Sequence, residues 1–312
     1  TKQSTMSVCH SVHERAVHEV REESNNSWDS FKKKINSILE DDVISYWKDR
    51  IEPLLCQGKF SELLILEKEN ITWKSIMFNL PRKVLKFAIN ACIDSLPSYS
   101  NLSRWGKRLT NKCPFCPNTT GTLHHILSHC PLLLESYTWR HNNVLKLIQT
   151  AITATGSGNF RVYCDIDGQT IAGGTIPPNI LVTNQRPDLV IVWDDPKQIL
   201  LIELTVPFEG NISDAHKRKV DRYKQLVQDL NETEYDTTYE AIEVGARGLV
   251  DKENKTRLKH ILGKCECNKR LKEMVNDLSK TAVLASFVIF YSRHEQTWSD
   301  APYMSVWLSL MF

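Results

Sequence analysis

Four residues of the types that bind soft metals lie between positions 113 and 130. They are Cys113, Cys116, His125 and Cys130, separated by gaps of two, eight and four residues. Three thiolates and an imidazole at these gaps can close around one tetrahedral zinc ion. His124 and His129 are nearby alternatives, but the four-residue gap before the last cysteine favours His125. Because four protein ligands leave no position for a reactive water, the spacing predicts a structural zinc.

A second group consists of two carboxylates in strongly apolar surroundings. Asp188 follows Arg186 and Pro187, and Glu203 lies inside the apolar run QILLIELTV. An isolated buried carboxylate is costly, and two brought together across a hairpin need a counter-ion. A divalent metal with oxygen ligands, Mg²⁺ or Mn²⁺, meets that need. Such a metal can activate water and stabilise a phosphorane-like transition state.

Lys219 is the candidate third member of this group. On the helix expected after Ser213, the apolar side chains fall in one arc, and His216 and Lys219 are the polar residues that share it. An ammonium that faces the two carboxylates can orient a water or neutralise charge on a phosphate. The alternative is an ion pair between Lys219 and Glu203 that is purely structural.

Two further clusters have charges that suit nucleic acid. The first is a basic patch of Arg104, Lys107, Arg108 and Lys112, with Trp105 among them. Basic residues interleaved with an aromatic ring suit nucleic-acid binding, although most such runs are solvated surface. The second cluster is Arg140 and His141, followed by Asn142, which either contacts phosphate or lies on the solvated face of its helix.

Hydrophobic periodicity predicts the elements that position these groups. The first hundred residues have helical spacing, and a helix is expected over residues 132–149. Strands are expected at residues 161–165, 188–194, 198–206 and 239–244, with a helix from 213 to 230 and two C-terminal helices. This order, αβββαβαα, predicts an α/β (α+β) domain with one mixed central sheet. The expected divisions are a helical segment (1–110), a zinc knuckle (111–131) and the α/β domain (132–312).

Composition limits the classes of function. The 312 residues contain 39 basic and 37 acidic side chains, a formal charge of +2, so any attraction to a polyanion must be local. The apolar runs are shorter than a membrane span, and no secretory signal is visible, which predicts no membrane partner. Cysteines that stand alone or cluster with histidines indicate an intracellular, reducing compartment. The first residue is not Met, which suggests a fragment or a processed piece.

Several motifs together resemble one known family. Arg186-Pro187-Asp188 followed by the segment from Glu203 to Glu209 resembles the restriction-like endonuclease of site-specific non-LTR retrotransposons. SLPSYSNLSRWG (residues 95–106), the knuckle and YTWRHNNVL (137–145) are similar to that family's linker, zinc knuckle and first nuclease helix. The resemblance continues through AHKRKVDRY and Gly245 to Gly248, and covers roughly residues 73–250.

The resemblance implies a PD-(D/E)xK nuclease that nicks target DNA, in the nucleus, so that the freed 3′ end primes reverse transcription. Asp188 and Glu203 match the metal-binding carboxylates, and Lys219 matches the motif lysine, because Thr205 stands where many restriction enzymes have lysine. The further family positions, with supporting roles, are Glu209, Tyr223 and Arg247. Element RNA is a further partner, and a reverse transcriptase domain is expected N-terminal to this segment or in trans, since no polymerase motif is found here.

Two other functions compete with the endonuclease. The first is a catalytically inert module whose zinc knuckle and basic patch bind nucleic acid. The intact Asp188, Glu203 and Lys219 argue against decay of the site. The second is a zinc-stabilised interaction protein without a nucleic-acid role, which the shared order of the motifs disfavours.

Overall fold

The computed structural model describes residues 28–51, 53–54, 79–116, 118–154, 159–166 and 175–294. The chain divides into two compact units, residues 1–65 and 66–312. In the first unit, helix α2 (Trp28–Ile51) confirms the helical spacing of that segment. Its apolar side chains Trp28 and Val43 are exposed. The side chains of Phe31 and Trp47, and the glycines of the loop expected after Asp165, lie outside the described residues.

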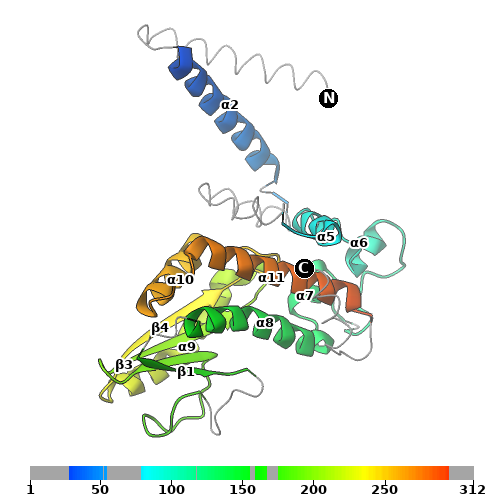
Figure 1. The fold of residues 1–312 in the computed structure, drawn as a ribbon. Coiled ribbons are helices and arrows are strands. Elements are labelled where there is room, and N and C mark those ends of the chain that lie inside the picture. The colour runs from blue at the N-terminus through cyan, green and yellow to red at the C-terminus, as the bar shows by residue number, and fades with distance from the viewer. Residues whose placement is uncertain are drawn as a thin grey trace. The chain divides into compact units, whose positions relative to one another are not determined.

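The second unit contains a mixed four-stranded sheet in the order β1-β2-β3-β4 (Figure 1). Its strands are β1 (Phe160–Cys164), β2 (Leu189–Trp193), β3 (Gln198–Thr205) and β4 (Asp236–Glu243). The first three strands are antiparallel neighbours, and β4 runs parallel to β3. Strand β3 is therefore central and apolar on both faces, as its unbroken apolar run predicts.

Helices cover both faces of this sheet. On one face pack α8 (Leu134–Thr153), α10 (Lys252–Lys264) and α11 (Leu271–Ser292). On the other face packs α9 (Ile212–Asn231). Successive residues of β3 alternate between the two layers: Leu200 and Ile202 face α8, whereas Ile199 and Leu201 face α9. The predicted order αβββαβαα and the mixed sheet are confirmed from α8 to α11.

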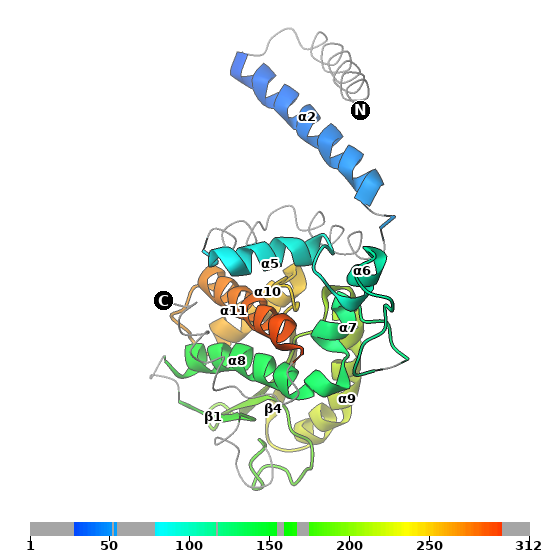
Figure 2. The same cartoon turned by 90° about the vertical axis from the view of Figure 1, so that its right-hand side faces the viewer.

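A second hydrophobic cluster joins the zinc knuckle to the helices around it. It contains residues of α5 (Arg82–Cys92), of α6 (Tyr99–Arg104), of α7 (Leu123–Ser128) and of the C-terminal half of α11. Figure 2 shows α5 lying beside α11, where Phe87 meets Phe287 and Phe290 with ring centroids 5.7 and 5.8 Å apart. Helix α11 thus contributes to both clusters, through Met274 to Ala282 in one and Val283 to Phe290 in the other.

The expected boundaries at residues 110 and 131 do not coincide with a division in packing. Residues 66–312 form one compact unit in which α5, the knuckle and α11 share side-chain contacts. The three-part division stays a prediction from the sequence. Among the described residues, none of the helices is both long enough and apolar enough to cross a lipid bilayer.

Candidate zinc centre and acidic site

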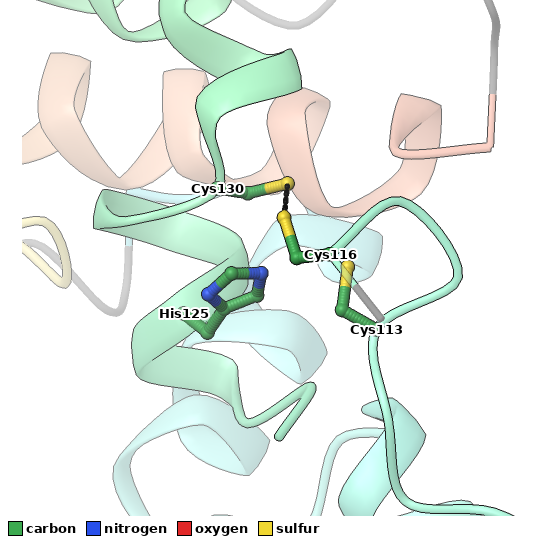
Figure 3. Close-up of side chains that lie close together, drawn as sticks. All are labelled: Cys113, Cys116, His125 and Cys130. Carbon is green, nitrogen blue, oxygen red and sulfur yellow. Dashed lines mark hydrogen bonds between the residues drawn. The ribbon is translucent and has the colours of Figure 1, made fainter. Parts of the chain in front are cut away.

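The zinc knuckle brings the four expected ligands together (Figure 3). The ligand atoms of Cys113, Cys116, His125 and Cys130 all lie within 4.8 Å of one another. A tight turn, in which Thr119 N–H donates to the Cys116 carbonyl at 2.8 Å, positions the first two cysteines. Thr122 caps helix α7 by accepting from His125 N–H at 3.1 Å, so that the imidazole on the first turn points at the thiols. The choice of His125 over its two neighbours is confirmed.

These four side chains fit a zinc ion in chemistry as well as in position. His125 Nε2 is buried and has no hydrogen-bond partner among the described residues. Burial raises the pKa of the Cys130 thiol, so a metal is needed to hold it as the thiolate that binds zinc. Helix α8 supports the knuckle, since the Tyr137 hydroxyl donates to Ile126 O at 2.8 Å and accepts from Cys130 N–H at 3.1 Å.

The purified protein is expected to contain about one zinc ion per chain. Cys113→Ser should lose most of this zinc, because a hydroxyl replaces one of four thiolate or imidazole ligands. Cys267→Ser is the matched control, since that thiol is half-buried and outside the cluster. Metal analysis by mass spectrometry measures both variants. Parental zinc content in Cys113→Ser would contradict the ligand assignment.

Strands β2 and β3 bring the two predicted carboxylates together. Leu189 pairs with Ile202 in an antiparallel register. Asp188, one residue before Leu189, therefore lies opposite Glu203, one residue after Ile202. As a result Asp188 N–H donates to Glu203 Oε2 at 3.1 Å. Glu203 is 2% exposed and, by the alternation of β3, belongs to the face that α9 covers.

Lys219 on α9 forms an ion pair with Glu203. The helical phase expected from the sequence is therefore correct. Burial raises the pKa of Glu203, the Asp188 carboxylate raises it further, and the Lys219 ammonium opposes both. The Lys219 side chain is still 25% exposed, so its ammonium lies between a buried carboxylate and solvent. Two carboxylates and one ammonium near the ends of two adjacent strands can bind a divalent cation and a phosphate.

His141 on α8 contacts the other carboxylate. Its Nε2 lies 3.1 Å from Asp188 Oδ2 and 3.2 Å from Leu204 O, so this nitrogen carries the proton that both acceptors share. Asp188 Oδ2 also accepts from Leu204 N–H at 2.7 Å. Burial lowers the pKa of His141, but its hydrogen bond to Asp188 and the charge of that carboxylate outweigh burial and raise it. His141 therefore contacts the acidic site, and its predicted role in binding nucleic acid stays a prediction.

Arg140 does not lie on a solvated face of α8. Its side chain is buried, with 2% of the residue exposed. The guanidinium donates to Ser286 Oγ and to Val206 O, each at 3.0 Å. The local pattern of α8 could not reveal these partners, because they come from distant parts of the chain. A solvated position for Arg140 is therefore excluded, and the predicted contact with phosphate stays a prediction.

The three residues expected to have supporting roles are buried around the site. Glu209 and Arg247 form an ion pair with side chains 0% and 2% exposed, in which Arg247 Nε donates to Glu209 Oε2 at 2.7 Å. Arg247 Nη1 also donates to Ala91 O of α5 at 3.2 Å. The Tyr223 hydroxyl donates to Arg186 O at 2.8 Å, behind the start of β2. These contacts hold the segments in place.

The basic patch precedes the knuckle and is only partly exposed. Arg104, Lys107 and Lys112 are exposed, as is Trp105 at 41%. Arg108 differs, since its guanidinium lies over the Tyr99 ring at 4.5 Å from the centroid. Three of the four predicted cations are therefore available to a ligand, and the fourth packs against the protein.

Sequence reasoning missed one charged cluster beside the acidic site. Glu243, at the end of β4, is completely buried and lies 3.1 Å from His216 Nδ1 and 3.4 Å from Arg257 Nη1. Burial raises the pKa of Glu243, although His216 and Arg257 oppose this rise. The signal was an acidic residue at the end of the apolar strand AIEV, together with His216 on the same arc as Lys219.

Comparisons with known proteins concern the knuckle. A comparison with curated proteins found no match. A family model described as "zinc-binding in reverse transcriptase" matches residues 58–139, less than half of the chain. All four zinc ligands fall inside this match. The chain thus carries a zinc-binding segment similar to those associated with reverse transcriptase.

Proposed function

We propose that this chain is a metal-dependent DNA endonuclease of the PD-(D/E)xK type, which nicks target DNA for a non-LTR retrotransposon in the nucleus. The observation that carries the proposal is the approach of Asp188 and Glu203 across adjacent strands, with Lys219 on Glu203. The family match to a reverse-transcriptase zinc-binding segment supports the link to such an element. The reverse transcriptase and the element RNA are its proposed partners.

The donor set fits Mg²⁺ or Mn²⁺. Asp188 and Glu203 would hold the ion through hard carboxylate oxygens, which these metals prefer. A cation held by both carboxylates would offset the repulsion from Asp188 that contributes to the raised pKa of Glu203. When bound, the metal supplies Lewis acidity and a more acidic water.

The remaining steps belong to side chains of this chain. Lys219, half-buried and next to Glu203, orients the attacking water and neutralises charge on the phosphate oxygens. His141 and Leu204 N–H together hold the Asp188 carboxylate in one orientation. The helix layers exclude solvent from Glu203, which strengthens these electrostatic contacts.

A supercoiled-plasmid assay tests the proposed activity. The full chain is expected to convert supercoiled DNA to nicked circles when Mg²⁺ or Mn²⁺ is added, and to leave it supercoiled without added metal. Asp188→Asn, purified in parallel, is the control for a contaminating nuclease. Metal-independent nicking, or nicking that persists in Asp188→Asn, would contradict the proposal. Binding of DNA without nicking would favour the inert nucleic-acid-binding module instead.

The exposed part of the basic patch is expected to contribute salt-sensitive DNA binding. Arg104→Glu with Lys107→Glu should weaken binding about tenfold or more at low salt and reduce the slope of log affinity against log salt. Arg108 is left unchanged because it packs on Tyr99. The control is Lys259→Glu with Lys272→Glu, which changes the formal charge equally, from +2 to −2, on exposed positions of α10 and α11. If the two double variants have equal slopes of log affinity against log salt, the basic patch does not contact DNA.

A further inference from the structure

A pocket of about 310 Å³ lies between the zinc knuckle and the acidic site. Ser128 and His129 of the knuckle line one wall, and Arg218 of α9 lines another. The chain that follows β3, residues 205–208, lines it as well. Its volume is near the lower end of the roughly 300–1,000 Å³ typical of small-ligand pockets. An occupant of this size is comparable to one nucleotide.

The pocket adjoins the two carboxylates through their own partners. His141, which contacts Asp188, and Lys219, which contacts Glu203, both line it. An occupant would therefore lie directly beside the acidic site. Asn211 also lines the pocket, and its amide lies 3.0 Å from His124 Nε2, so the knuckle is joined to the start of α9.

Three buried donors that line the pocket lack partners. They are Ser128 Oγ, Thr205 Oγ1 and Arg140 Nε, none of which has a hydrogen-bond partner among the described residues. Buried polar atoms are usually paired, because an unpaired one destabilises the folded state. The Arg140 side chain is a fully buried cation at this site. Three unpaired donors around one cavity indicate a ligand rich in acceptor oxygens.

The charge of the lining indicates an anionic ligand. Arg140, Arg218 and Lys219 are cations, and no Asp or Glu occurs among the described residues that line the pocket. Hydroxyl and guanidinium donors match the acceptor oxygens of a phosphodiester. Tyr137, Phe208 and His129 add rings against which a base or sugar can pack.

We propose that this pocket binds one nucleotide of the DNA strand, the one adjoining the phosphodiester that the acidic site attacks. This inference rests on the proposed function, because the nuclease activity defines the phosphodiester that reacts. It adds the place where the DNA strand next to that phosphodiester binds. The zinc knuckle then forms one wall of the nuclease site through Ser128 and His129. Arg140, Thr205 and Arg218 are positioning residues that hold the backbone of the strand.

The unpartnered hydroxyls allow a test that leaves the fold intact. Ser128→Ala and Thr205→Val each remove a hydroxyl without a protein partner, so the melting temperature should stay the same or rise. Each should raise KM for nicking of a short DNA duplex by about five- to tenfold and leave kcat within about twofold. Fluorescence anisotropy of a single-stranded DNA 12-mer without divalent metal should show a similar loss of affinity.

Two buried hydroxyls elsewhere provide matched controls. Ser279 Oγ and Thr237 Oγ1 are also buried without a partner among the described residues, but neither residue lines the pocket. Ser279→Ala and Thr237→Val should therefore leave KM and DNA affinity at parental values. For the cation, Arg218→Ala should weaken binding more than Arg222→Ala, an exposed position one turn further along α9.

The outcomes separate this inference from the proposed function. If the parent nicks DNA and the pocket variants keep the KM and affinity of their controls, the nucleotide pocket is overturned and the nuclease stands. If the parent does not nick but the pocket variants bind DNA more weakly than their controls, the pocket stands and the nuclease fails. If the parent neither nicks nor binds DNA, both are overturned.

Discussion

Lys219→Ala is expected to slow nicking on the order of a hundredfold or more, which corresponds to about 3 kcal/mol of transition-state stabilisation. The ammonium is the charged group that reaches Glu203 from α9, and it lines the pocket beside the two carboxylates. Thr205, two residues after Glu203, offers no second ammonium at that strand position. The single-turnover rate with the enzyme in saturating excess over plasmid is the measurement, because it isolates the chemical step.

Two lysines of the same helix are the controls. Lys217 and Lys224 are exposed, and alanine at either should change nicking little. Thermal melting is measured in parallel, because removal of one partner from a buried pair also destabilises the fold. Near-parental nicking by Lys219→Ala would reduce the pair with Glu203 to a structural contact. A larger loss for Lys217→Ala would show that another face of α9 meets the DNA.

Glu209→Ala is expected to lower the free energy of unfolding by about 3–5 kcal/mol. This change leaves the guanidinium of Arg247 buried without its counter-ion, since both side chains are almost fully inaccessible. Glu209 also accepts from the backbone N–H of Arg247, and a Cβ on Gly245 would lie 2.4 Å from its Oε1. The carboxylate thus holds the turn after β4 as well. Urea denaturation measures the loss.

Two further variants serve as references for the stability that Glu209→Ala loses. Glu234→Ala removes an exposed, solvent-screened ion pair with Lys197 and should lower the free energy of unfolding far less than Glu209→Ala does. The double change of Glu209→Leu with Arg247→Met should recover much of the stability, because well-packed apolar side chains replace both charges. If Glu209→Ala has the same free energy of unfolding as the parent, the ion pair of Glu209 with Arg247 does not stabilise the junction between α5 and the sheet.

The layer structure could be predicted from the sequence because strand and helix periodicities are local. The apolar run around Glu203 is too continuous for an edge strand, and β3 is central in the sheet. The arc that places Lys219 among apolar residues is also local to one helix, and its contact with Glu203 follows from it. The zinc ligands were predictable because their spacing within one short segment encodes their geometry.

Residues whose partners are distant in sequence could not be placed in this way. Arg140 looked like a surface cation, but Val206 and Ser286 accept its hydrogen bonds from segments 66 and 146 residues away. His141 meets Asp188 across 47 residues. A polar residue on an amphipathic helix is usually solvated, and only the tertiary fold reveals the protein partners of these two.

The packing around the knuckle could not be predicted for a related reason. Composition marks the knuckle as a separate motif, yet its apolar residues Leu123 and Ile126 belong to the same cluster as Phe290 of α11. The sequence of the knuckle alone does not indicate that a helix from the C-terminal part of the chain packs against it.

Helix α11 also has a consequence for synthesis of the protein. Residues 274–282 complete one hydrophobic cluster and residues 283–290 the other, and the ribosome makes them after every other described element. Until this helix leaves the exit tunnel, the sheet and the knuckle both expose apolar surface that chaperones bind. The nascent chain would therefore complete both clusters late in translation and almost together. A nascent chain on a ribosome that stalls between residues 264 and 292 would therefore be unusually prone to aggregate.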